Sequence, residues 1–240
     1  MARPASVRPR VSIRRRFRGQ GLFESRSHRG LASADVRVPV RRWQPPRRLP
    51  TTTAGARLQS LIKGAELLAS STGTVRTGEG WFVLNAREAR WSHALGRSAV
   101  CEFEGEVPFE QIGINLSSLN PGEAMAQYHW EADQEDFLVL AGEALLIIEG
   151  EEHPIKAWDF VHCPPGASHV IVGAGNRRCV VLAMGARDRS TGDDWGAYPV
   201  DPVALRHGAG VDRETSIPAE AYAGLPRRRP AAFEPSWLPE

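Results

Sequence analysis

The chain has 240 residues, which is enough for one large domain or for a small domain with extensions. Its 30 basic and 28 acidic side chains give a formal net charge of only +2, and no apolar run reaches the roughly 18 residues that a membrane-spanning helix needs. These features exclude a helical membrane protein, so we expect no membrane partner.

The small net charge hides two oppositely charged pieces. Residues 1–50 contain fourteen arginines but only two acids, Glu24 and Asp35, which is a formal charge of +12, whereas the other 190 residues carry −10. The basic piece lacks helical or strand periodicity, so we predict that residues 1–74 are a disordered Arg-rich segment. No recognition motif accompanies the arginines and the body is acidic, so we do not expect a nucleic-acid partner.

Three alternatives stay open for this N-terminal segment. The segment could be translated upstream sequence, with the natural start further along the chain than Met1. Leu58, Leu61 and Ile62 have helical spacing, so a short amphipathic helix within residues 51–75 is the second alternative. The third is an organellar transit peptide, because such peptides are rich in arginine and poor in acids.

From Trp81 onward, short apolar or alternating runs are separated by glycine, proline and asparagine. This pattern is typical of an all-β sandwich or barrel, and we predict such a domain over residues 78–186. The runs that we expect to form strands are 81–85, 98–104, 112–119, 136–150 (with Gly142 and Gly150 bracketing one hairpin arm), 159–163, 169–175 and 178–186. The charged run 149–153 within this region is predicted to be a solvated turn.

Residues 187–240 form a predicted C-terminal extension with irregular structure. One short helix is expected to begin near Pro202 and another within residues 216–225. The proline-rich tail contains Phe233, Trp237 and Leu238, and these side chains would be costly to expose together. We therefore expect the tail to lie against the barrel or against a partner subunit.

Four residues of the β region are candidate metal ligands. His129, Glu131 and Glu135 share odd numbering, so a continuous strand would place them on one face, with His169 arriving from a second strand. Ionisable groups are rarely buried without a partner, so their convergence inside a barrel favours a bound cation. A mixed set of imidazole and carboxylate ligands suits Fe, Mn, Zn or Ni.

The role of Glu131 is left open among three possibilities. It is a fourth ligand, a bystander at the barrel mouth, or a catalytic general base beside the metal. Without it, His129, Glu135 and His169 form a two-histidine, one-carboxylate set with open coordination positions. His153 and His162 are predicted to lie outside the ligand shell, and Cys163 is predicted to be a small packed residue.

These segments resemble the two signature motifs of the cupin superfamily, over roughly residues 110–185. The first motif is matched by Gly122, His129, Glu131, Glu135 and Gly142, and the second by Pro164, Gly166 and His169. Glu131 stands where the family usually has its second histidine, and Trp158 and Gly173 replace the opening glycine and closing asparagine of the second motif. The resemblance implies a small RmlC-like cupin domain, a double-stranded β-helix (jelly roll), that binds a divalent metal ion.

The family contains several kinds of protein, so the resemblance leaves the activity open. The expected function is that of a metal-dependent enzyme, dioxygenase- or isomerase-like, acting on a small polar metabolite. The alternatives are a noncatalytic module that binds a small ligand or sugar, and a structural protein with a degenerate site. We also expect a homodimer that protects the edge strands. Cys101, Cys163 and Cys179 are odd in number and form no C-x-x-C pair, which favours reduced thiols and a cytoplasmic location.

Overall fold

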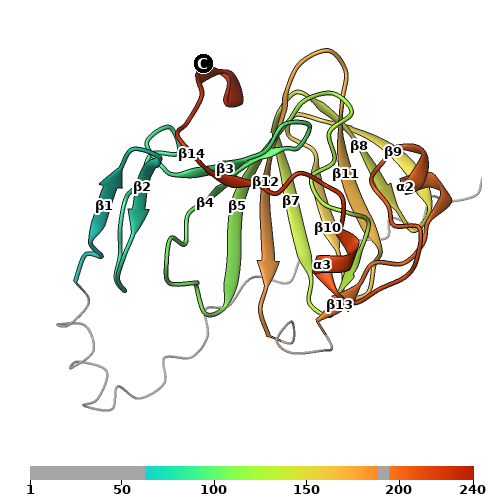
Figure 1. The fold of residues 1–240 in the computed structure, drawn as a ribbon, viewed down its shortest axis with the longest axis horizontal. Coiled ribbons are helices and arrows are strands. Elements are labelled where there is room, and N and C mark those ends of the chain that lie inside the picture. The colour runs from blue at the N-terminus through green and yellow to red at the C-terminus, as the bar shows by residue number, and fades with distance from the viewer. Residues whose placement is uncertain (1–62, 189–194) are drawn as a thin grey trace, which may run out of the picture. The chain divides into compact units, whose positions relative to one another are not determined.

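The computed structural model describes residues 63–188 and 195–240, which belong to one compact unit spanning residues 51–240. The all-β prediction is confirmed, and every strand pairing in this part of the chain is antiparallel apart from isolated bridges (Figure 1). The strands are β1 (Leu67–Ser70), β2 (Gly73–Arg76), β3 (Trp91–His93), β4 (Ala99–Glu102), β5 (Ile112–Leu119), β6 (Trp130–Glu131), β7 (Glu135–Ala141), β8 (Glu143–Ile148), β9 (Glu151–Lys156), β10 (Phe160–Cys163), β11 (His169–Ala174), β12 (Cys179–Ala186), β13 (Gly196–Ala197) and β14 (Arg229–Ala231). The short helices are α2 (Pro202–Arg206), α3 (Pro218–Ala221) and the 3-10 helix η1 (Pro235–Trp237).

Two sheets form the body of the domain. The larger sheet has seven strands in the order β10-β7-β12-β5-β4-β3-β14, and the smaller has the order β11-β8-β9. Phe137 and Val181 of the larger sheet share one buried cluster with Leu146 and Ile171 of the smaller sheet. The two sheets therefore enclose a common apolar core, which is what a double-sheet jelly roll requires.

The turn between β7 and β8 shows how the sequence specifies the hairpin. Gly142 has φ 76°, a left-handed conformation that glycine adopts without steric cost. A Cβ at this position would also lie 2.3 Å from the carbonyl oxygen of Arg178. Gly142 is thus needed both for the turn and for the close approach of the chain leading into β12.

The charged run at residues 149–153 differs from its prediction. The turn is confined to Glu149 and Gly150, and residues 151–153 belong to strand β9. β9 is an edge strand that contains Pro154, and edges tolerate both proline and charge because one row of backbone groups has no ladder partner. The sequence of β9 therefore lacks the apolar alternation that marks the inner strands.

The predicted disorder of residues 1–74 is corrected for its last part. Residues 67–76 form the β1–β2 hairpin, in which Leu67 and Leu68 lie in a strand rather than in the helix considered for this region. Both leucines are exposed, so this hairpin buries little apolar surface of its own. The part of the prediction that concerns residues 1–62 lies outside the described residues.

The C-terminal extension is part of the barrel structure. β14 pairs with β3 at the end of the larger sheet, and β13 pairs with β6, so strands from beyond residue 186 complete the domain. Trp237 is fully buried, with its ring centroid 5.2 Å from that of Trp91, as expected for a tail that lies against the barrel. The two predicted short helices are confirmed as α2 and α3. Neither they nor any other helix of the described residues could cross a membrane.

Candidate metal centre

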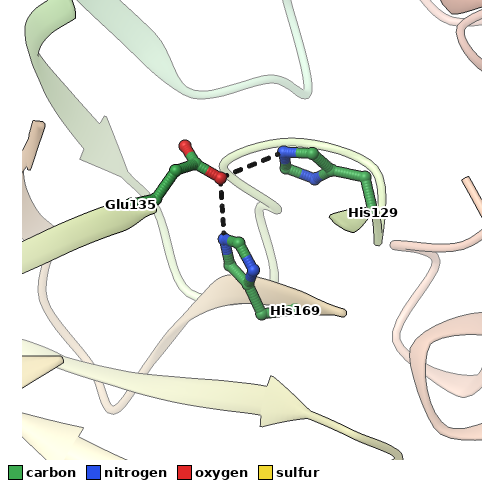
Figure 2. A group of neighbouring side chains, drawn as sticks. All are labelled: His129, Glu135 and His169. Carbon is green, nitrogen blue, oxygen red and sulfur yellow. Dashed lines mark ion pairs between the residues drawn. The ribbon is translucent and has the colours of Figure 1, made fainter. Parts of the chain in front are cut away.

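Three of the four candidate ligands come together at one end of the barrel interior. His129 directly precedes β6, Glu135 is the first residue of β7, and His169 is the first residue of β11. The two histidines are paired across strands, because the amide of His129 donates to the carbonyl of His169 at 3.1 Å and the reverse bond measures 2.8 Å. Backbone pairing therefore fixes both imidazoles beside each other (Figure 2).

Glu135 does not lie on one continuous strand with His129 and Glu131, contrary to the prediction. β6 ends at Glu131, and residues 132–134 bend the chain before β7 begins. Same-parity numbering therefore accounts for His129 and Glu131 but not for Glu135. The bend, rather than strand alternation, turns the Glu135 carboxylate towards the histidines.

The distances among the three side chains fit a shared cation. Glu135 Oε2 lies 3.2 Å from His169 Nε2 and 3.5 Å from His129 Nε2. The dashed lines in Figure 2 mark these two ion pairs. One ligand atom from each residue lies within 4.8 Å of the other two. Two ligand atoms that are each about 2.1 Å from one metal ion would be about 3.0–3.4 Å apart in octahedral or tetrahedral geometry, so the two distances from Glu135 Oε2 are close to those expected around a shared ion.

Hydrogen bonds to the backbone orient both imidazole rings. His129 Nδ1 lies 2.8 Å from the carbonyl oxygen of Gln127, and His169 Nδ1 lies 3.0 Å from the carbonyl oxygen of Ala167. A carbonyl only accepts, so each Nδ1 carries the proton and donates it. In the neutral rings this leaves a lone pair on each Nε2, which is the tautomer that a metal-binding histidine uses.

The buried atoms at the centre of the site lack hydrogen-bond partners within the described residues. Glu135 Oε2 and His169 Nε2 are both buried in this way. With neutral imidazoles both atoms are acceptors, and their 3.2 Å approach is unfavourable unless a positive species lies between them. A proton or a metal cation would satisfy both, and the donor set of two nitrogens and one carboxylate fits a transition-metal ion.

The pKa values of His129, His169 and Glu135 also indicate that this site favours positive charge. Burial lowers the pKa of His129, but the carboxylates of Glu131 and Glu135 outweigh burial and raise it to about 10. Burial likewise lowers the pKa of His169, while its interactions with Cys163 and Glu135 raise it to about 9. Burial raises the pKa of Glu135, and the two histidines bring it down to about 2. In the absence of metal the site therefore holds protons.

Glu131 lies at the edge of this group. Its Oε1 is 3.6 Å from His129 Nε2, but the carboxylate is not one of the three groups that converge. Glu131 and Glu135 both line a cavity of about 320 Å³, together with Trp195 from beyond the barrel strands. The position of Glu131 fits a side chain that faces a ligand in this cavity.

Aromatic rings surround the histidines. Tyr198 lies against His129 with ring centroids 5.7 Å apart, and Phe137 lies 5.3 Å from His169. Trp195 packs on Tyr198 at 5.4 Å and donates from Nε1 to the carbonyl of Ser216. Sequence reasoning missed Trp195 and Tyr198, because the residues around them form no periodic pattern that would place them beside the barrel.

His153 and His162, the two histidines predicted to lie outside the ligand shell, contact other residues. His162 is half exposed and contacts Asp136 Oδ1 at 2.6 Å, and His153 is exposed beside Glu151. Cys163 is buried in the barrel core, and Trp158, in place of the opening glycine of the second motif, keeps a left-handed φ of 76°. The glycine-like turn is thus retained despite the substitution.

Comparison with known proteins identifies the region that contains the site. Residues 115–185 match the family model described as Cupin domain. No curated protein matches the sequence.

Several solved structures are similar to parts of the chain. A candidate sugar phosphate isomerase from Acidithiobacillus ferrooxidans is 30% identical with a TM-score of 0.34, and the match covers 37% of this chain but only 60% of that one. A sugar phosphate isomerase of the cupin superfamily from Silicibacter pomeroyi is 26% identical, with a TM-score of 0.35 and coverage of 41% and 70%. A predicted oxalate decarboxylase from Thermotoga maritima is 22% identical, with a TM-score of 0.38 and coverage of 44% and 98%.

Proposed function

Because residues 115–185 form a cupin domain, we propose that this protein binds one divalent metal ion through His129, Glu135 and His169 and acts there as an enzyme on a small polar metabolite. The observation that carries the proposal is the meeting of Glu135 Oε2 and His169 Nε2 at 3.2 Å, both buried and both without a hydrogen-bond partner in the described residues. A cation in this position would relieve two buried unsatisfied acceptors at once.

Each part of the site has a distinct task. Fe, Mn, Zn or Ni, the ions that suit this donor set, would supply Lewis-acid or redox chemistry according to identity. The carbonyl groups of Gln127 and Ala167 hold the two imidazoles in the metal-binding tautomer. Glu131, which lines the cavity beside His129, would accept or return a proton of the bound metabolite.

Metal content is the test of this proposal. Protein purified without a nickel column should contain about one metal ion per chain by inductively coupled plasma mass spectrometry. His129→Ala, Glu135→Ala and His169→Ala should each lose most of the metal and stay folded, because metal binding requires all three ligands. His162→Ala is the matched control, since His162 is a half-exposed histidine whose partner is Asp136, and it should keep the metal. Full occupancy in His169→Ala would remove that residue from the site.

We also propose that the protein is a cytoplasmic homodimer. Support for the dimer comes from β10, an edge strand of the larger sheet, which carries Phe160 with 61% of its surface exposed and follows Trp158 with 75% exposed. Support for the location comes from the three cysteines, which are all free and buried. Light scattering on the wild type and on Phe160→Glu should give a dimer and a monomer, respectively. A monomeric wild type would contradict the dimer.

A further inference from the structure

Three neighbouring strands build the cavity beside Glu135 from residues with small side chains. In the register of β5, β12 and β7, Gly113 lies opposite Gly185, and Gly185 lies opposite Glu135. Directly opposed residues of antiparallel strands project to the same face. The two glycines therefore leave open space in the row that contains the Glu135 carboxylate.

Arg187 occupies part of this space. The ladder continues past β12, because the Arg187 amide donates to the Gln111 carbonyl at 3.1 Å, so Arg187 projects to the same face as Gly185. A Cβ on Gly113 would lie 2.9 Å from Arg187 Nη2 and 3.4 Å from Cζ and Nε. The guanidinium thus lies directly over Gly113, two strand spacings or about 10 Å from the Glu135 backbone.

Arg187 is held by one edge of its guanidinium. Nη1 donates to Glu104 Oε2 at 2.8 Å and to the Phe109 carbonyl at 2.7 Å, and Nη2 donates to Glu104 Oε1 at 2.7 Å. This pairing fixes the group and neutralises its charge. Among residues 63–188 and 195–240, no acceptor bonds Nε–H or the second Nη2–H, and these two parallel donors form the side-on fork that matches a carboxylate or phosphate.

The same cavity contains other groups suited to a small polar ligand. Arg187, Asn115 and Trp195 line it together with Glu131 and Glu135. Arg187 remains 32% exposed, so its remaining donors are accessible to solvent and hence to a ligand. The indole of Trp195 is fixed by its hydrogen bond to the Ser216 carbonyl and forms a rigid wall.

We infer that the metabolite carries an anionic carboxylate or phosphate group, and that the side-on edge of Arg187 binds this group and determines specificity. The inference rests on the proposed function, because a divalent ion is needed to offset the carboxylates of Glu131 and Glu135, which would otherwise repel an anion. One end of the ligand lies at the metal and the other at Arg187, so the ligand is shorter than about 10 Å. Anion binding is therefore metal-dependent.

Calorimetric titration of the metal-loaded protein with inorganic phosphate and with malonate tests the inference and separates the two anion sources. The wild type should bind at least one of them with millimolar affinity or better, and the tighter probe identifies the class of anionic group. Arg187→Lys keeps the charge but loses the planar fork, and it should weaken binding about 10- to 100-fold.

A double variant guards against a folding defect in the single variant. Arg187→Gln combined with Glu104→Gln removes the pair without leaving the largely buried Glu104 carboxylate unpaired, and it should show the same loss of anion affinity. Arg206→Gln is the matched control, because Arg206 is an exposed arginine paired with Glu152 outside the cavity, and it should bind the probes like the wild type.

Metal content, measured on every sample after titration, separates a failure of the role inferred for Arg187 from a failure of the proposed metal site. Failure of both anions to bind a metal-loaded wild type, or unchanged affinity in both Arg187 variants with metal retained, would overturn the role of Arg187 and leave the metal site standing. A wild type that contains no metal and takes up none would contradict the proposed function itself, and the inference with it.

Discussion

Removing the ring of Trp237 should strongly destabilise the protein, although only three residues follow it in the sequence. Its side chain is fully buried and packs in one cluster with Trp91, Leu116 and Val180. Replacing a buried tryptophan with alanine costs about 3–5 kcal/mol, because transfer energy is lost and a cavity remains. Domains of this size are stable by about 5–15 kcal/mol in total, so Trp237→Ala should lose a large share of that stability.

Trp237→Phe is the matched control for this change. Trp237 Nε1 is buried and has no hydrogen-bond partner within the described residues, so phenylalanine removes an unsatisfied donor while keeping most of the ring. We expect a loss of about 1 kcal/mol or less. Urea denaturation should lower the midpoint by about 2 M for Trp237→Ala, given a slope of about 2 kcal/mol per M, with metal content unchanged. A loss below about 1 kcal/mol in Trp237→Ala would refute the claim that the tail is part of the core.

Three further predictions concern the site and its supporting strands. The folded-state pKa values of His129 and His169, about 10 and 9, exceed the ordinary 6.5, so these groups stabilise the metal-free protein most below about pH 6.5. The melting temperature of the metal-free protein should therefore fall between pH 7 and 10, and a melting temperature that does not change with pH would contradict these pKa values. Glu131→His should keep the metal and shift preference towards softer ions, and a metal profile and activity unchanged in both this variant and Glu131→Ala would show that the side chain faces away from the ion. Gly196→Ala would place Cβ 2.1 Å from a backbone oxygen of β6 and should cost clearly more in thermal denaturation than Gly208→Ala, where nothing lies within 4 Å, whereas equal losses would argue against close β6–β13 contact.

The run 81–85 was wrongly predicted as a strand, because it forms only an isolated bridge at Trp81. The other strands that sequence patterns predicted are the ones whose burial dictates their composition. β5, β11 and β12 are apolar or alternating because one or both of their faces are buried, and their predicted ranges agree closely with the structure. β9 and β14 were not predicted, because edge strands carry charge and proline, which sequence reasoning reads as loop. Their positions depend on which strand they pair with, and local sequence does not encode that choice.

The residues of the site also differ in whether the sequence alone could identify them. The two motifs that contain His129, Glu135 and His169 could be recognised from residue types and spacing, and the structure brings these three side chains together. Trp195 and Arg187 could not be assigned to the cavity, because their proximity to Glu135 follows from strand register and from a chain segment that returns after the barrel. The space over Gly113 and Gly185 likewise depends on the alignment of two strands more than 70 residues apart.

Anomalous X-ray scattering from crystals of the protein, recorded at the absorption edge of the metal found in solution, tests the central claim most directly. We predict one strong peak within about 2.0–2.3 Å of His129 Nε2, His169 Nε2 and a carboxylate oxygen of Glu135. An absent peak in metal-supplemented crystals, with His169 Nε2 hydrogen bonded directly to Glu135, would contradict a metal centre at this position.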